Sequence, residues 1–172
     1  SCASRELTQP SETRTPPSYL MVQDSDGVYF TLDNALSEMG KEVGGIWSGT
    51  MTLTGVDLET LWFSDRPDRI AFKKPTRTFV QSFSTTFTAA NGGAPNAVVS
   101  WDDQKTDTEQ YVVLELFKPK LEGNSLKYSV VGLPLDDPKT RLPLPREEQF
   151  VPPAKPDVLG KVTLFIDNAP PP

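Results

Sequence analysis

Residues 47–54 read Trp-Ser-Gly-Thr-Met-Thr-Leu-Thr. Trp47, Met51 and Leu53 stand at alternate positions, and the threonines fill the positions between them. Successive side chains of a β-strand point to opposite faces, so this alternation predicts a strand with one buried face. The same period recurs along the chain, and it decides the fold class.

Other runs rich in β-branched and aromatic residues predict further strands. We expect them over residues 19–22, 28–32, 60–64, 69–72, 97–101, 111–117, 126–132 and 161–167. The nearly continuous apolar run Val112-Val113-Leu114 is typical of a central strand that is buried on both faces.

Turn residues between these runs predict how some strands are joined. The sequence Gln-Asp-Ser-Asp-Gly at residues 23–27 predicts a hairpin between the first two runs, and Glu-Gly-Asn at residues 122–124 predicts another. Asp33 is expected to cap a short helix over residues 34–39, which Gly40 would end.

Residues 76–88 fit two structures. Phe79, Phe83 and Phe87 recur every four residues, as on one face of an amphipathic helix, but a strand would also place them on one face. The Ser and Thr residues lower the helix propensity, whereas Pro75 and Thr76 supply a start signal for a helix. We favour the helix.

The chain of 172 residues has the length of one domain. The elements predict a mainly β (α+β) fold, an antiparallel sheet or sandwich of about seven to nine short strands with one or two short helices packed on it. This domain should cover residues 19–168, with residues 134–157, which hold seven prolines, as a long surface loop. Residues 1–18 are expected to form a flexible tether and residues 169–172 a tail.

Composition excludes several classes of function. The net charge is −6, and the basic cluster around Lys73 and Lys74 is interleaved with Asp65 and Asp68, so no nucleic-acid partner is expected. The chain contains no histidine, which removes Ser-His-Asp triads, Cys-His pairs and histidine-based metal sites. We therefore expect no cofactor and no metal, and an enzymatic role is not favoured.

Cys2 is the only cysteine, so no internal disulfide can form. Ser1-Cys2-Ala3-Ser4 resembles the processing site of bacterial lipoproteins, in which a small residue precedes the cysteine that becomes the acylated N-terminus. This resemblance predicts a lipid on Cys2 after removal of a signal peptide. The alternative is an incidental thiol in a plain exported or cytoplasmic protein.

The residues that follow Cys2 are rich in Ser, Thr and Pro and cannot bury enough surface to fold, which suits a tether. The lipid predicts a location in the bacterial cell envelope, on the periplasmic side. By resemblance to enterobacterial sorting, Ala3 rather than Asp after the cysteine favours the outer membrane.

At residues 61–69, Leu-Trp-Phe-Ser-Asp-Arg-Pro-Asp-Arg, the sequence resembles an uncharacterised family of exported bacterial proteins and lipoproteins. Its members share Phe-Ser-Asp-Arg-Pro-x-Arg, an aromatic-bearing helix, Pro-Asn-Ala, Leu-x-Gly-x-x-Leu-x-Tyr and a terminal Leu-Phe-Ile-Asp. The last three motifs stand here at residues 95–97, 121–128 and 164–167. The likeness covers about residues 47–167; it supports the helix at residues 76–88 and implies no activity.

The segment from Ser64 to Arg69 is the best candidate for a specific site. Arginine holds a carboxylate or phosphate through a planar, bidentate fork, so Arg66 and Arg69 beside Asp65 can orient an anionic ligand. We favour a structural interpretation over this ligand site: Asp65 closes a turn that Pro67 rigidifies, and the arginines form ion pairs with nearby acidic residues.

Three other sets of residues have a structural reading that we favour over a functional one. Residues 24–27 resemble half of a calcium loop but suit a turn better, because Val22 stands where an acid is needed. The acidic stretch of residues 102–109 suits a solvated loop better than acid–base catalysis. Trp47, Trp62 and Trp101 suit the core better than a ligand groove.

The leading functional prediction is a membrane-tethered envelope lipoprotein whose domain has a non-catalytic binding or assembly role, with another envelope protein as a possible partner. The alternative is a soluble domain that binds a small anionic ligand at the turn of Asp65 to Arg69, and the least favoured reading is a carboxylate-dependent hydrolase. A deep pocket with two convergent carboxylates would favour the enzyme, and a flat apolar patch would favour the partner-binding domain.

Overall fold

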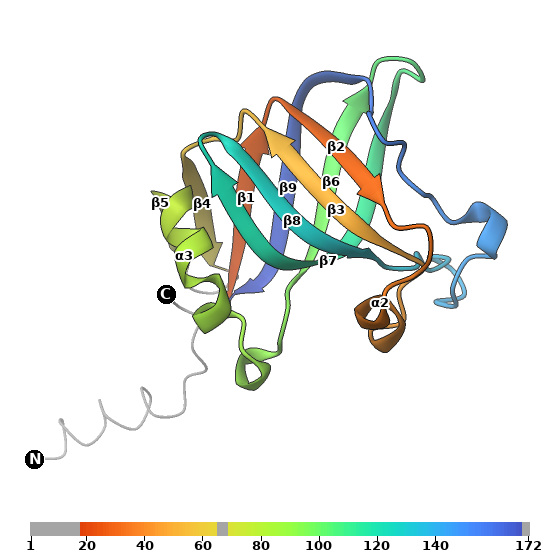
Figure 1. The fold of residues 1–172 in the computed structure, drawn as a ribbon, viewed down its shortest axis with the longest axis horizontal. Helices are drawn as coiled ribbons and strands as arrows, with labels where there is room; N and C mark the ends of the chain where they lie inside the picture. The colour runs from red at the N-terminus through yellow and green to blue at the C-terminus, as the bar shows by residue number, and fades with distance from the viewer. Residues whose placement is uncertain (1–17, 65–68, 170–172) are drawn as a thin grey trace, which may run out of the picture.

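The computed structural model describes residues 18–64 and 69–169, which form one antiparallel sheet of nine strands with two short helices (Figure 1). The elements in chain order are β1 (Tyr19–Ser25), β2 (Gly27–Leu32), α2 (Glu38–Glu42), β3 (Trp47–Thr54), β4 (Glu59–Ser64), β5 (Ala71–Pro75), α3 (Thr76–Thr86), β6 (Asn96–Asp103), β7 (Thr108–Glu122), β8 (Ser125–Gly132) and β9 (Val158–Ala169). The spatial order is β2-β3-β8-β7-β6-β9-β1-β4-β5. The predicted mainly β, antiparallel fold is confirmed.

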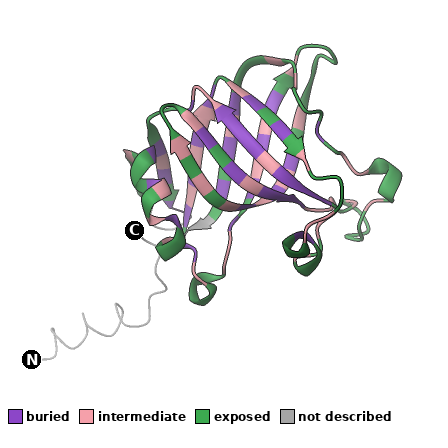
Figure 2. Ribbon diagram, in the orientation of Figure 1, coloured by how far each residue is buried: buried purple, intermediate pink, exposed green. Residues whose placement is uncertain are grey.

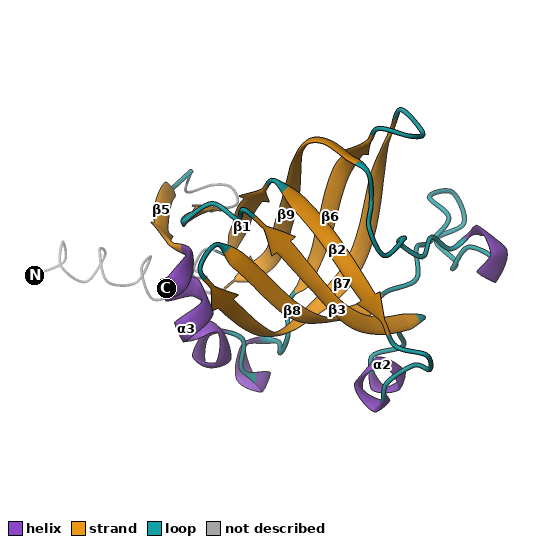
Figure 3. Cartoon of the chain, turned by 45° about the horizontal axis from the view of Figure 1, so that its top comes forward, coloured by secondary structure: helices purple, strands orange, loops and turns teal. Residues whose placement is uncertain are grey.

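The first two strands do not form the predicted hairpin. β1 pairs with β9 and β4, whereas β2 pairs with β3, and only Asp26 separates β1 from β2. The chain turns a corner here, where the Asp26 backbone N–H donates to the Thr54 carbonyl at 2.9 Å. The sheet is strongly curled as a result, and β2 lies near β9 (Figure 3).

The error has a physical reason. Gln23 and Ser25 look like turn residues, but both are fully buried and continue the inward face of β1. Burying a polar side chain costs little free energy when its hydrogen bonds are satisfied. The polar residues at positions 23 and 25 therefore did not indicate, from composition alone, that the strand continued through them.

Inward side chains of the curled sheet form one core, and burial alternates along most strands (Figure 2). Trp47, Trp62 and Trp101 are all buried, which confirms that they belong to the core. β7 is central, as predicted, but it is buried on one face only: Val112 and Leu114 point inward, and Val113 is half-exposed on the outer face.

The predicted helix over residues 76–88 is confirmed by α3. Its phenylalanines are buried: the ring centroids of Phe79 and Phe83 lie 5.8 Å apart, and those of Phe83 and Phe87 lie 4.8 Å apart. α3 contacts β7, β5 and β4, and thus covers one end of the sheet (Figure 1).

The other predicted helix is displaced. α2 begins after Ser37, whose Oγ accepts a hydrogen bond from the Gly40 N–H at 3.0 Å, so Ser37 rather than Asp33 is the cap and Gly40 lies inside the helix. Both Asp and Ser are good caps, but the Asp33 carboxylate accepts a hydrogen bond from Ser48 of β3 instead.

Residues 134–157 form the long loop that was predicted, with a single 3-10 turn at Arg146–Glu148. The Gln149 side chain holds the loop together through hydrogen bonds to the backbone of Leu135 and Leu144. Neither helix of the described chain has the length and apolarity needed to cross a membrane.

A chain of hydrogen bonds crosses the core. The buried Tyr128 hydroxyl donates to Gln23 Oε1 at 2.6 Å, and Gln23 Nε2 donates to Thr60 Oγ1 at 3.3 Å. Thr60 and Thr76 share a hydrogen bond of 3.0 Å, and Thr76 Oγ1 donates to the Asp57 carbonyl at 2.7 Å. Because the Thr76 proton is used in the last bond, Thr60 must be the donor to Thr76, so every link runs in one direction.

Candidate functional site

Most of the residues predicted to form a site lie outside the described part of the chain. These are Cys2, Asp65 and Arg66. Arg69 is described: it is exposed, and its φ is 53°. Next to it, the Ile70 N–H donates to Ser64 Oγ at 2.7 Å and the Ser64 N–H donates to the Ile70 carbonyl at 2.8 Å, so Ser64 and Ile70 are held together. The anion site at this turn stays a prediction.

The two acidic stretches have local structural roles. Asp24 Oδ1 accepts from Thr163 Oγ1 at 3.0 Å, across the β1–β9 pair. Asp103 Oδ1 accepts the N–H groups of Thr106 and Lys105, and these hydrogen bonds lower the pKa of the Asp103 carboxyl. Within residues 18–64 and 69–169, no three Cys, Asp or Glu side chains gather closely enough to hold a metal ion.

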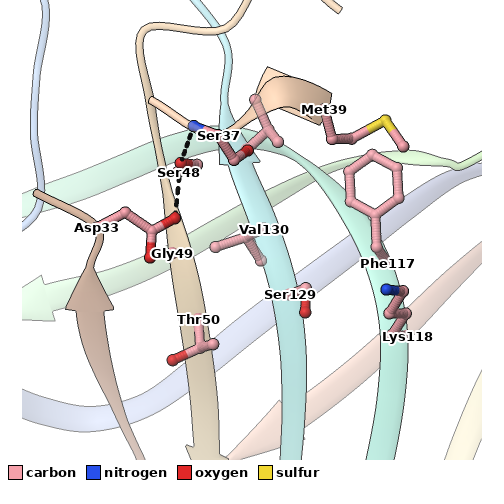
Figure 4. A pocket seen from close by; sticks show the side chains of 11 residues that line it. Asp33, Ser37, Met39, Ser48, Gly49, Thr50, Phe117, Lys118, Ser129 and Val130 are labelled. Atoms are coloured by element: carbon pink, nitrogen blue, oxygen red, sulfur yellow. Dashed lines mark hydrogen bonds between the residues drawn. The ribbon is translucent and has the colours of Figure 1, made fainter. Parts of the chain in front are cut away.

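A pocket of about 260 Å³ lies on the outer face of the sheet, between α2 and strands β3, β8 and β7 (Figure 4). Its floor carries the hydroxyl groups of Thr50 and Ser129, which are cross-strand neighbours. Met39 of α2 and Phe117 of β7 supply an apolar wall. The pocket thus combines a polar floor with an apolar side, as small-molecule sites do.

Asp33 at one end of the pocket is held by hydrogen bonds (Figure 4). The Ser48 hydroxyl donates to Asp33 Oδ2 at 2.8 Å, and it accepts from the Ser37 N–H at 2.9 Å. Ser48 is buried, so its hydroxyl is a fixed support, and no other residue of the described ranges donates a hydrogen bond to the second carboxylate oxygen of Asp33.

Lys118 at the other end is placed by a β-bulge. The β7–β8 register shifts between Phe117 and Lys120, and Lys118 has a φ of 47°. A non-glycine residue in this left-handed region is uncommon and costs conformational energy. Bulges re-aim side chains and are frequent beside functional sites. Lys118 is exposed and also lines a neighbouring pocket with Phe83 and Phe87, so its side chain borders both pockets.

The pocket therefore carries a carboxylate at one end and an ammonium group at the other, with hydroxyl groups between them. Sequence reasoning missed this arrangement, because Asp33 was interpreted as a helix cap and Lys118 lies just beyond the strand predicted over residues 111–117. Lys118-Pro119 within a run of alternating apolar residues was the one available signal, since proline is typical of bulges and strand irregularities.

No protein-family model, curated protein or solved structure matches this chain. The likeness of residues 61–69 to an exported family therefore stays a prediction, and the geometry of the pocket is the main guide to function.

Proposed function

We propose that the chain is a non-catalytic binding domain of the bacterial cell envelope, tethered on the periplasmic side through a lipid on Cys2, and that its outer-face pocket holds a small zwitterionic solute. One observation carries the binding role: Asp33 and Lys118, of opposite charge, close the two ends of a hydroxyl-lined floor.

The dimensions suit a small ligand. Asp33 follows β2 and Lys118 lies on β7, and these strands stand three places apart in the sheet, or about 14 Å at the usual strand spacing. Both side chains line the pocket and so occupy part of this distance. The remaining gap suits a molecule whose amine and carboxylate lie a few ångströms apart, such as an amino acid or a dipeptide.

Binding fits the site better than catalysis. Asp33 is the one carboxylate among the described residues that line the pocket, so a pair of carboxylates for acid–base work is not brought together there. The Ser48 hydroxyl already donates to Asp33 and accepts from Ser37, which uses it for support rather than as a nucleophile.

Titration with alanyl-alanine, followed by NMR, tests the pocket. We expect shifts at Thr50 and Ser129, and we expect Asp33→Asn and Lys118→Gln each to weaken binding about tenfold or more, because each removes a charged hydrogen-bonding partner. Lys127→Gln is the matched control, since Lys127 is an exposed lysine of β8 that does not line the pocket.

The half-probes acetate and ethylammonium separate the two ends. Acetate binding should depend on Lys118 and ethylammonium binding on Asp33. Equal affinity of the wild-type protein and both charge variants for alanyl-alanine, or no shift at millimolar concentrations, would exclude this ligand class.

Replacing Cys2 by alanine tests the tether. In cells that make the protein with its own signal peptide, we expect Cys2→Ala to abolish incorporation of labelled palmitate and to move the protein from the membrane fraction to the periplasmic extract. Ser4→Ala should change neither result. Mass spectrometry that finds an unmodified Cys2 thiol in the native protein would contradict the lipid anchor, while leaving the pocket hypothesis intact.

A further inference from the structure

The outer face of the sheet is divided into two halves of different chemistry. On β2, β3 and β8 the outward side chains are mainly hydroxyl-bearing or charged: Tyr29, Thr31, Thr50, Thr52, Thr54, Lys127 and Ser129. On β4, β1, β9, β6 and β7, five apolar side chains stand at outward positions: Leu61, Val22, Phe165, Val98 and Val113. We call these five residues the apolar row.

The strand register aligns the apolar row. Leu61 pairs with Val22, Val22 with Phe165, Phe165 with Val98, and Val98 with Val113. A second apolar pair, Leu20 and Phe63, lies directly beside the row on β1 and β4. Because directly paired side chains lie about 5 Å apart, these residues form one continuous surface.

The row is open to solvent. In the row, Phe165 is 38% exposed and the other four residues are half-buried, and Phe63 beside the row is 36% exposed. On one side it is bordered by polar residues, including the hydrogen-bonded pair Asp24 and Thr163. A continuous apolar patch in the middle of a sheet face is typical of a surface that another protein covers.

The ends of the row carry opposite charges. Lys73 of the edge strand β5 pairs with Leu61 and continues the row at one end. Glu115 follows Val113 on the same outward face of β7 at the other end, where it is half-buried. Phe165 lies on β9, the middle strand of the five.

We propose that the apolar row is the interface of a symmetric dimer, so that its occupant is a second copy of this chain. A twofold axis along β9 brings Phe165 of one copy onto Phe165 of the other. This axis places the β4–β5 end of each copy over the β6–β7 end of the other copy. Lys73 of one copy and Glu115 of the other then lie at the same end of the interface. An isologous contact requires this kind of self-complementarity.

The dimer is expected to be weak. Five strands span only about 19 Å between the outermost backbones, which places the contact at the low end of specific interfaces. We expect a dissociation constant in the micromolar range. The inference is independent of the proposed ligand pocket, because that pocket lies outside the apolar row.

Sedimentation equilibrium of the 172-residue chain, over concentrations from about 1 to 500 µM, measures the association. We expect Phe165→Glu to weaken it at least tenfold, while Tyr29→Glu, at an exposed position on the hydroxyl-bearing half, leaves it unchanged. Lys73→Glu and Glu115→Lys should each weaken the dimer, and the double variant should restore it. A wild-type protein that stays monomeric throughout, or a dimer that Phe165→Glu leaves intact, overturns the proposal.

Cross-linking gives a second measurement that does not depend on a charge in the row. In a Cys2→Ala background, Phe165→Cys introduces a single thiol on the proposed axis, so oxidation should join two chains. Tyr29→Cys in the same background should remain monomeric. Equal cross-linking of the two variants would indicate random collision and would contradict the interface.

Discussion

Replacing Gly132 by alanine is expected to lower the free energy of unfolding by about 3 kcal/mol. Gly132 of β8 pairs directly with Trp47 of β3, and a Cβ atom at residue 132 would overlap the Trp47 indole ring. That ring is buried and packs edge-to-face on Phe30, with the planes at 90°, so any movement away from residue 132 would disrupt this packing. Overpacking a rigid core site forces strain into the surrounding backbone.

Urea denaturation, with Gly27→Ala as the matched control, measures this effect. At Gly27 the nearest atom to an added Cβ is Thr54 Oγ1 at 2.8 Å, the end of a side chain that can rotate, so we expect a loss below about 1 kcal/mol. Trp47→Val in the Gly132→Ala background should cost less than it does alone, because the smaller side chain removes the overlap. Additive losses would show that the indole ring is not the obstacle.

Interrupting the buried hydrogen-bond chain is the second large effect that we expect. Gln23→Leu leaves the Tyr128 hydroxyl buried without its acceptor, which should cost about 2–3 kcal/mol of the free energy of unfolding. Tyr128→Phe leaves Gln23 Oε1 without its donor and should cost about 1–2 kcal/mol.

The double variant is the decisive comparison. Gln23→Leu with Tyr128→Phe removes both partners of the 2.6 Å hydrogen bond, so neither the hydroxyl of residue 128 nor the amide oxygen of residue 23 remains to be left unsatisfied. We expect its total loss to be smaller than the sum of the two single losses, as is typical when both partners become apolar. A loss equal to that sum would mean that the two side chains contribute independently through packing.

Tyr128, in the same series of buried hydrogen bonds, is expected to lower the stability of the protein at alkaline pH. Burial raises the pKa of the Tyr128 hydroxyl above the value of 10.0 that it has in an unfolded chain. The neutral form is therefore favoured in the folded state, and its contribution to stability is complete below pH 10 and is lost as the pH rises above it. Each pH unit in that range should remove about 1.4 kcal/mol, and Tyr128→Phe should abolish this part of the pH dependence.

Phenolate absorbance checks the sign directly. In the folded protein the Tyr128 signal should be missing from the titration near pH 10 and should appear only on unfolding. If Tyr128→Phe left the stability between pH 10 and 11 as steep as in the wild-type protein, a different group would cause the loss of stability at alkaline pH.

The sequence by itself determined the strands, the helix α3 and the proline-rich loop. Period-two alternation predicted β3, because this pattern follows from the geometry of a single strand. The spacing of Phe79, Phe83 and Phe87 fitted a helix or a strand, and the start signal of Pro75 and Thr76 favoured α3. Two predictions were wrong: the boundaries of the first helix, and the hairpin between β1 and β2. In both places the local sequence fitted two structures equally well. Gln23 is the clearest case, since it has the polarity of a turn residue but lies in the core.

Only the tertiary structure decided which residues meet. The carboxylate of Asp33 and the ammonium of Lys118 share a pocket because β3 and β8 lie between β2 and β7, and the apolar row exists because five strands distant in sequence fall into register. Local period indicates which face a side chain occupies, whereas strand order and register depend on the packing of the whole chain. Pairings across the sheet, and with them the candidate sites, are therefore properties of the fold rather than of any one segment.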